Sequence, residues 1–299
     1  MTVRPFRPAD AGGVVDVLAE VVPYLVTTAE AFAWQLALGD DAPEKQRVWV
    51  AEDGSRIVGF VRAGLAVATE NRAFVIPFVL PSARRSGIGT ALVTAGEAYI
   101  RSLGATSVRS WVVDDPASAR FASDRGFTPG LAATFQSLDL GTFAVPRPRP
   151  PAGVEVLPGT ALDDPRPLYL LDAEATRDIP SYDGDGIDYA TWRSRSWDRP
   201  DIDRALTTVV TVDGAVAGYT LAQTDRRDRY WSAMTGVLRA HRGRGLAMLA
   251  KVDSLSRARD AGYRIAYTAN DETNAPMLAV NRTLGYRPAA TQWRYDKAL

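Results

Sequence analysis

The chain has 299 residues, of which 46% are hydrophobic and 23% charged, and its formal net charge at pH 7 is zero. This composition is typical of a globular protein of one or two domains and lacks the basic excess usual for nucleic-acid binders. With no cysteine and one histidine, His241, the sequence excludes disulfides, thiolate metal sites, a cysteine nucleophile and a histidine-based triad. We therefore predict no bound metal and no nucleic-acid partner.

The amino-terminal residues, MTVRPFRPADAGGVV, lack the long apolar core of a signal peptide. No apolar run approaches the length of about 18 residues that a membrane span needs. We therefore expect a cytoplasmic protein with no membrane partner, acting as a monomer or a homodimer.

Apolar periodicity and turn signals predict alternating helices and strands in the first half of the chain. A glycine-broken basic turn, ARRSGIGT at 83–90, lies between a strand and a helix. The expected elements are a helix at 14–25, a hairpin around 51–60, a strand at 74–82, a helix at 90–104, a strand at 107–113 and a short helix that ends before Gly126.

A proline-rich segment, AVPRPRPPAG at 144–153, has four prolines in ten positions and cannot form a helix interior or a central strand. Such a segment near the middle of the chain is typical of a semi-rigid linker. It predicts two domains, at 1–143 and 154–299.

The second half repeats the order of the first. A second basic turn, AHRGRGLA at 240–247, again follows a strand and precedes a helix. The expected elements are a helix at 167–179, a hairpin around 211–219, a strand at 231–238, a helix at 246–262, a strand at 264–269 and a short helix that ends before Gly285. The glycine landmarks of the two halves are separated by 158 or 159 residues, namely Gly59 and Gly218, Gly87 and Gly245, Gly104 and Gly262, and Gly126 and Gly285.

This constant offset indicates a duplicated domain. The alternation of helices and strands predicts an α/β (α+β) fold in each half, with a mixed sheet flanked by helices.

Each basic turn has the features of an anion site. The first N–H groups of a helix have no internal partner and carry partial positive charge, so they favour a phosphate. Glycines let a ligand approach the main chain, and arginines add bidentate hydrogen bonds. Neither turn matches a Walker A loop or a dinucleotide-binding GxGxxG fingerprint.

Arg84, Gly87 and Gly89, and Arg242, Gly245 and Ala247 in the second half, fit the R-x-x-G-x-G/A motif of the GCN5-related N-acetyltransferase (GNAT) superfamily. Both halves resemble this family over most of their length, which implies two tandem GNAT-like domains, each with a mostly antiparallel sheet. The resemblance implies acetyl-CoA as cofactor, with its pyrophosphate on the turn amides and its pantetheine arm at the strand end. The implied cofactor residues are Val79, Arg84, Arg85, Ser86, Gly87, Ile88, Gly89 and Thr90, and Val237, Leu238, Arg239, Arg242, Gly243, Arg244, Gly245, Leu246, Ala247 and Asn274.

The family's usual general acid, a Tyr seven residues after a cofactor-binding Asn, is replaced in both halves. Asn281 stands at that position after Asn274, and Ala122 stands there after Asp115. Asn281 could donate a hydrogen bond to the thiolate, whereas Ala122 could not. The C-terminal domain is therefore favoured as the active one, and the N-terminal domain binds cofactor, shapes the cleft or is a degenerate copy.

The amine acceptor needs a base or a water relay. An acidic segment at 171–188 lies where this superfamily usually covers the acceptor, and it would attract a cationic amine such as an aminoglycoside, polyamine or amino sugar. Glu174 is the first candidate for a base, with Asp178, Glu30 and Thr235 as substrate contacts. The alternative is a solvated loop of turn-forming residues.

These observations favour an acetyl-CoA-dependent N-acetyltransferase that acts on a small-molecule amine by direct transfer. A mycothiol synthase-like enzyme is a narrower alternative. A non-catalytic acyl-CoA binding or sensing protein is a second alternative, and amine-dependent release of free coenzyme A distinguishes it from an enzyme.

Overall fold

The computed structural model describes residues 2–37, 44–66, 71–179, 186–270 and 273–299. It divides into two compact units, which we call the first and the second unit. The first comprises Met1–Ala133 with Ala290–Leu299, and the second comprises Thr134–Ala289. Among the described helices, none is both long and apolar enough to cross a membrane.

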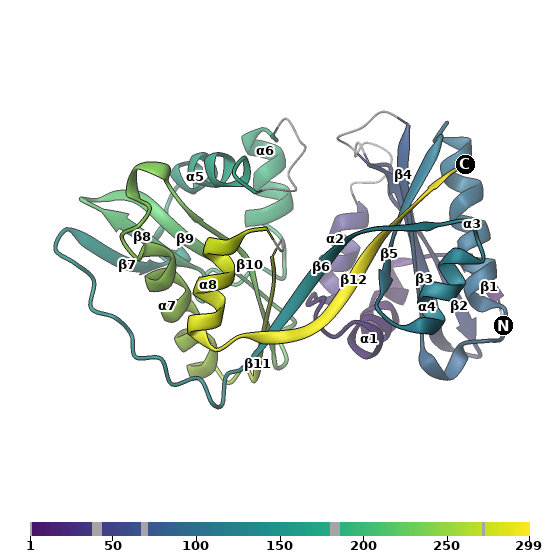
Figure 1. Cartoon of the computed structure of the whole chain (residues 1–299), viewed down its shortest axis with the longest axis horizontal. Coiled ribbons are helices and arrows are strands. Elements are labelled where there is room, and N and C mark those ends of the chain that lie inside the picture. Colours follow the sequence, from purple (N-terminus) through teal and green to yellow (C-terminus); the bar gives the residue numbers. More distant parts are fainter. Residues whose placement is uncertain (1, 38–43, 67–70, 180–185, 271–272) are drawn as a thin grey trace. The chain divides into compact units, whose positions relative to one another are not determined.

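The first unit is a mixed sheet flanked by helices (Figure 1). Its strand order is β1-β2-β3-β4-β5-β12, and every neighbouring pair is antiparallel except β4 with β5. The elements are β1 (Thr2–Pro5), α1 (Ala11–Val21), α2 (Ala29–Ala37), β2 (Arg47–Asp53), β3 (Arg56–Leu65), β4 (Arg72–Val79), α3 (Ile88–Ser102), β5 (Ser107–Val113), α4 (Pro116–Ser123) and β12 (Arg287–Ala298).

The second unit repeats this plan with strand order β7-β8-β9-β10-β11-β6, and only β10 and β11 are parallel. The fold class expected from the sequence is confirmed. The elements are β6 (Thr128–Asp139), β7 (Val154–Pro158), α5 (Arg166–Thr176), α6 (Tyr189–Trp192) with a following π-helical turn (Arg193–Trp197), β8 (Thr208–Val212), β9 (Ala215–Thr224), β10 (Arg229–Val237), α7 (Leu246–Asp260), β11 (Ile265–Asn270) and α8 (Ala275–Leu284).

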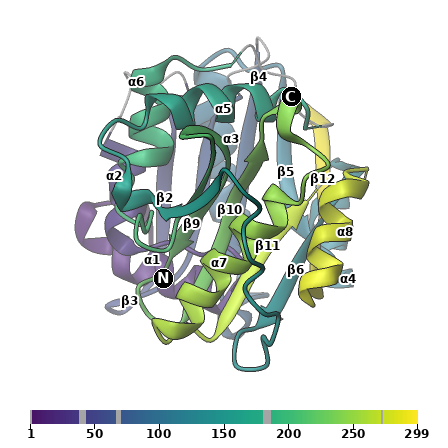
Figure 2. The ribbon, with the colours of Figure 1, turned by 90° about the vertical axis from the view of Figure 1, so that its left-hand side faces the viewer.

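The last strand of each sequence half pairs with a strand of the other half. β6 follows α4 in the chain but pairs with β11, from Thr134 opposite Asn270 to Asp139 opposite Ile265 (Figure 2). Likewise β12 follows α8 but pairs with β5. The two repeats of the sequence therefore meet in the proline-rich segment. The two compact units do not coincide with these repeats, because each unit contains one strand from the other repeat.

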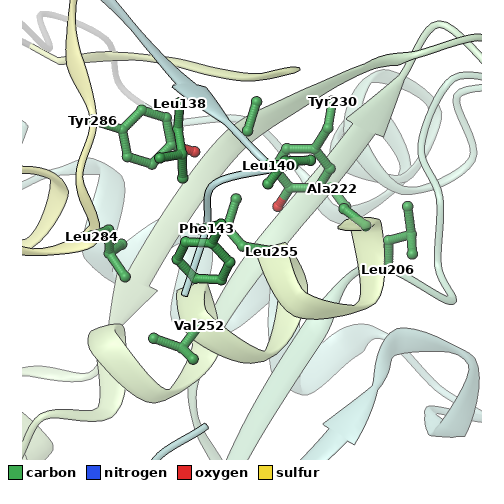
Figure 3. Close-up of a cluster of buried hydrophobic side chains, with 12 residues drawn as sticks. Leu138, Leu140, Phe143, Leu206, Ala222, Tyr230, Val252, Leu255, Leu284 and Tyr286 are labelled. Atoms are coloured by element: carbon green, nitrogen blue, oxygen red, sulfur yellow. The ribbon is translucent and has the colours of Figure 1, made fainter. Parts of the chain in front are cut away.

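The core of the second unit depends on this exchange. Leu138, Leu140 and Phe143 come from the first half of the sequence, and all three are buried against Val252 and Leu255 of α7 (Figure 3). Each buried Leu or Phe side chain contributes about 1.5–3 kcal/mol relative to an exposed one. The second half of the sequence therefore lacks an important part of its core when it stands alone.

The proline-rich segment contains no helix or strand, and it packs on the second unit. Val145 packs against the same core cluster, and Arg147 donates a hydrogen bond to Asp260 at 3.1 Å. Just before the segment, the main-chain oxygen of Phe143 accepts a hydrogen bond from Arg259. These contacts hold the segment against the second unit, so it is not a flexible linker that lacks contacts.

Candidate cofactor and active site

A gap opens between the two parallel strands of the first unit. β4 and β5 pair only where Arg72–Phe74 lies opposite Ser107–Arg109. Both strands then continue without pairing with each other, to Val79 and Val113. The strands diverge toward the end at which the basic turn follows β4.

The second unit has the same arrangement. β10 and β11 pair only where Arg229–Trp231 lies opposite Ile265–Tyr267, and they run on to Val237 and Asn270. The two strand ends that the resemblance singles out, at Val79 and Val237, are thus equivalent positions next to equivalent gaps.

Both basic turns place two residues in the left-handed backbone region before the helix begins. Arg85 and Gly87 have φ values of 65° and 85°, and the corresponding Gly243 and Gly245 have values of 74° and 77°. The helices α3 and α7 start immediately after Gly87 and Gly245, and neither has a side-chain cap. The N–H groups of each first helical turn therefore remain available to an anionic ligand.

The motif arginine of each turn contacts the strand that precedes it. Arg84 Nε donates to the main-chain oxygen of Val79 at 3.3 Å, and Arg242 Nε donates to that of Val237 at 3.1 Å. This hydrogen bond links the beginning of the turn to the end of the strand. The motif arginine thus has a structural role in both units.

A cavity of about 440 Å³ occupies the gap in the first unit. Its volume lies within the range of about 300–1,000 Å³ that is usual for small-molecule sites. Apolar side chains of β4, β5 and α4 form most of its wall, and Arg84, Arg85 and Gly87 of the turn border it. Ser110 and Gln292 are the buried polar residues of the lining, and Gln292 is supplied by the exchanged strand β12.

The cavity combines the features that a coenzyme A thioester requires. An apolar wall suits the pantetheine arm, while an uncapped helix start beside arginines suits the pyrophosphate. Among the residues that the structure describes, no carboxylate lies within 4.0 Å of Arg84 or Arg85. The charge of this turn is therefore available to a ligand.

In the second unit, two carboxylates already bind the turn. Glu174 accepts a hydrogen bond from the main-chain N–H of Arg239 at 2.7 Å. Asp178 accepts hydrogen bonds from the guanidinium groups of Arg239 and Arg242, which hold its pKa well below the usual range. The sequence predicted that Glu174 and Asp178 contact the amine, whereas the structure brings them to the cofactor turn.

Asn281 is buried, and its amide group is engaged within the protein. Nδ2 donates to Oε1 of Gln136 at 2.9 Å and to Oδ1 of Asn270 at 2.5 Å. Both amide protons are used, so a hydrogen bond to a thiolate would require breaking one of these two. Asn274 caps α8 by accepting from Met277 N, as Asp115 caps α4.

The remaining predicted substrate residues lie apart from the first-unit cavity. Glu30 is exposed in the first turn of α2 and does not line the cavity. Thr235 Oγ1 lies 3.1 Å from Thr220 Oγ1 in the second unit. Residues 180–185 of the acidic segment lie outside the described residues.

A buried carboxyl group on α5 was not singled out by the sequence. Asp172 accepts hydrogen bonds from Trp192 Nε1 at 2.7 Å and from the Tyr219 hydroxyl. Burial raises the pKa of Asp172. Its helical spacing from the buried Leu168 and Ala175 was the available signal, because a carboxylate on the buried face of a helix needs partners.

Substitution of Asp172 by Ala is expected to destabilise the second unit by about 3 kcal/mol. It leaves two buried donors, Trp192 Nε1 and the Tyr219 hydroxyl, without an acceptor, and each such group costs about 1–3 kcal/mol. Urea unfolding monitored by tryptophan fluorescence measures the change, with Asp163→Ala, at an exposed position before α5, as the control. A loss below 1 kcal/mol would contradict the importance of this network.

Comparison with known proteins agrees with this geometry. Residues 16–127 match the model of the Acetyltransferase (GNAT) family. A solved tandem GNAT protein from the clavulanic acid biosynthesis pathway is 25% identical, with a TM-score of 0.75 over 99% of this chain and 98% of that chain. Residues 16–127 thus resemble the GNAT family, and the chain is similar to a tandem GNAT protein along nearly its whole length.

Two further relatives extend the comparison. A mycothiol acetyltransferase from Parafrankia sp. (strain EAN1pec) is 27% identical over 273 residues, which cover 83% of this chain and 82% of the relative. A GCN5-related N-acetyltransferase from Sphaerobacter thermophilus shares the fold, with 21% identity and a TM-score of 0.68 over 99% of this chain and 95% of that chain. These matches support an N-acetyltransferase activity, and proteins with the GNAT fold generally use acetyl-CoA.

Proposed function

We propose that the first unit of this GNAT protein binds acetyl-CoA and that the chain transfers the acetyl group directly to the amine of a small molecule. The observation that carries the proposal is the cavity between β4 and β5, which opens at an uncapped helix start. Bound there, acetyl-CoA would supply a thioester carbonyl to a neutral amine. With no cysteine in the chain, an acyl-cysteine relay is excluded.

The residues of the first unit divide the binding between them. The amides of Ile88, Gly89 and Thr90 and the guanidinium groups of Arg84 and Arg85 would hold the pyrophosphate, as the resemblance implies. Ser110 and Gln292 offer hydrogen bonds to the amide groups of the pantetheine arm.

No side chain at the usual acid position can protonate the leaving thiolate, because Ala122 stands there. Water is the remaining proton donor, and absence of a positioned acid typically lowers a rate by about 10²–10⁴. We therefore expect a modest turnover number.

The choice of the first unit differs from the preference that the sequence suggested. Asn274 and Asn281 favoured the C-terminal domain, but both side chains are engaged in hydrogen bonds within the second unit. Arg239 and Arg242 of that unit are also paired with Asp178, whereas Arg244 contacts His241. The first-unit turn has no comparable carboxylate among the described residues, which supports that unit as the cofactor site.

The acceptor is a small amine, and an amino sugar derivative is the second candidate function to test. This candidate is favoured by the relative named mycothiol acetyltransferase, whose alignment covers 83% of this chain. A panel of amino sugars, a cysteinyl amino sugar, polyamines and aminoglycosides, assayed by free-thiol release, separates these acceptors.

Substitution of Gly87 by Glu tests the proposed site. The carboxylate would lie where the pyrophosphate binds, so we expect loss of acetyl-CoA binding in calorimetry and at least about a 100-fold loss of amine-dependent thiol release. Gly245→Glu is the matched control, because it imposes the same left-handed backbone strain and the same charge on the other turn. Retained binding in Gly87→Glu together with loss in Gly245→Glu would refute the assignment to the first unit.

A further inference from the structure

The helices that follow the two turns differ at one inward-facing position. α3 and α7 are both 15 residues long and both start directly after a left-handed glycine. Val93 and Lys251 are therefore the sixth residue of their helices and equivalent to each other. Val93 lines the first-unit cavity, and Lys251 is 1% exposed in the second unit.

Two further positions are matched by a shared hydrogen bond. The main-chain N–H of Phe127 donates to the oxygen of Ala122, and that of Tyr286 donates to the oxygen of Asn281. Ala122 is thus equivalent to Asn281, and Phe127 to Tyr286. Both first-unit residues line the cavity, and each second-unit counterpart is larger or more polar.

All three second-unit side chains are buried inside that unit, and those of Lys251 and Tyr286 lie against each other. Lys251 Nζ lies 5.3 Å from the ring centroid of Tyr286, and Asn281 bonds to Asn270 near the end of β11. All of Lys251, Asn281 and Tyr286 are at most 2% exposed. They occupy the positions that surround open space in the first unit.

A second closing element acts at the turn itself. Asp178 forms ion pairs with both Arg239 and Arg242, and Glu174 accepts a hydrogen bond from the main-chain N–H of Arg239. A pyrophosphate would have to displace both carboxylates, which repel its negative charge. We call Glu174 and Asp178 the clamp, and Lys251, Asn281 and Tyr286 the plug.

We propose that the second unit carries a closed copy of the cofactor cavity, in which the plug fills the space for a coenzyme A thioester and the clamp covers the turn. Lys251 is then the main specificity-determining residue, because the change from the cavity-lining Val93 to lysine extends the side chain further than the other two changes, alanine to asparagine and phenylalanine to tyrosine. This inference rests on the proposed function of the first unit. It predicts that each chain binds a single coenzyme A thioester.

Burial is compatible with a lysine in this role. Burial lowers the pKa of Lys251 to about 7, so the amine enters the core mostly neutral above that pH. A neutral amine on an aromatic ring costs much less to bury than an ammonium ion. The side chain of Lys251 therefore stays buried without needing a carboxylate partner.

The test replaces the plug with the residues of the first unit and removes the charge of Asp178, the clamp residue that pairs with both arginines. The variant Lys251→Val, Asn281→Ala, Tyr286→Phe with Asp178→Asn is titrated with acetyl-CoA in calorimetry, beside the wild type and Lys251→Val alone. We expect the stoichiometry to rise from one to two per chain in the fourfold variant. Addition of Gly245→Glu should remove the gained site and leave the first.

The converse variant installs the plug in the first unit. Val93→Lys should abolish binding of acetyl-CoA by the wild-type cavity, provided that circular dichroism shows the native fold. Because the gain of a site in the fourfold variant does not depend on this substitution, misfolding of Val93→Lys leaves the test intact.

The outcomes separate the two proposals. In one outcome, the wild-type chain binds two molecules, of which Gly87→Glu removes one and Gly245→Glu removes the other. That result would overturn the closed copy and would leave the first-unit site intact. A single wild-type site that is lost in Gly245→Glu alone would overturn both proposals. A fourfold variant that keeps one site would overturn the role of the plug and the clamp.

Discussion

Cleavage of the chain within residues 144–153 is expected to leave both fragments in one particle. The second unit contains residues 134–143, and the first contains residues 290–299, so each fragment supplies a strand to the other's compact unit. A protease site placed between Pro148 and Pro151 allows the cut after folding. Gel filtration in native buffer should show co-elution, and in urea it should show two separate species.

Separate expression of the halves 1–143 and 154–299 should give unstable products. The second half would lose Leu138, Leu140 and Phe143, which together contribute about 5–9 kcal/mol. That loss is comparable to the whole stability of an ordinary domain, about 5–15 kcal/mol. Co-expression should restore soluble protein, and a stable monomeric 154–299 fragment with cooperative unfolding would contradict the exchange.

Substitution of Lys251 by Met is expected to stabilise the protein, by an amount that depends on pH. The pKa of Lys251 falls from 10.5 to about 7 on burial, so between these values the unfolded chain binds a proton that the folded chain does not. The free energy of unfolding of the wild type therefore decreases as the pH falls from 10.5 to 7, by up to about 1.4 kcal/mol per pH unit. Methionine does not titrate, so Lys251→Met lacks this dependence of stability on pH.

The free energy of unfolding of Lys251→Met should thus exceed that of the wild type by about 4 kcal/mol at pH 7.5. This difference should shrink toward pH 10 and level off below pH 7. Urea unfolding at several pH values between 7 and 10 measures it. Val93→Met, at the equivalent position of α3, is the control, since it changes no titratable group. A difference in the free energy of unfolding that does not change with pH would show that Lys251 stays protonated in the folded protein.

Sequence patterns predicted the repeated elements closely. The helix expected at 90–104 is Ile88–Ser102, and the helix expected at 246–262 is Leu246–Asp260. These predictions succeed because helix periodicity and a terminal glycine are local properties. The two turns were also found from sequence, since a left-handed backbone next to a helix start favours glycine.

The strand exchange was not predictable in the same way. β6 and β12 are equivalent strands, because they follow the equivalent helices α4 and α8. Each of them could therefore pair with either β5 or β11. Which of the two it joins depends on the path of the chain after Phe127 and Tyr286. That path is a tertiary property, because nearly the same ladder of hydrogen bonds forms in either case.

The sequence by itself determined the duplicated α/β architecture, the two glycine-containing basic turns and the family resemblance, because spacing and glycine conformation encode them locally. Only the tertiary structure decided which strand completes each sheet and how the space beside each turn is lined. The second decision depends on volume and charge brought together from distant segments. Lys251 is unremarkable in the sequence, and Asn281 and Asp178 were expected to contact the thiolate and the amine. Only the fold buries Lys251 and Asn281 and pairs Asp178 with the turn.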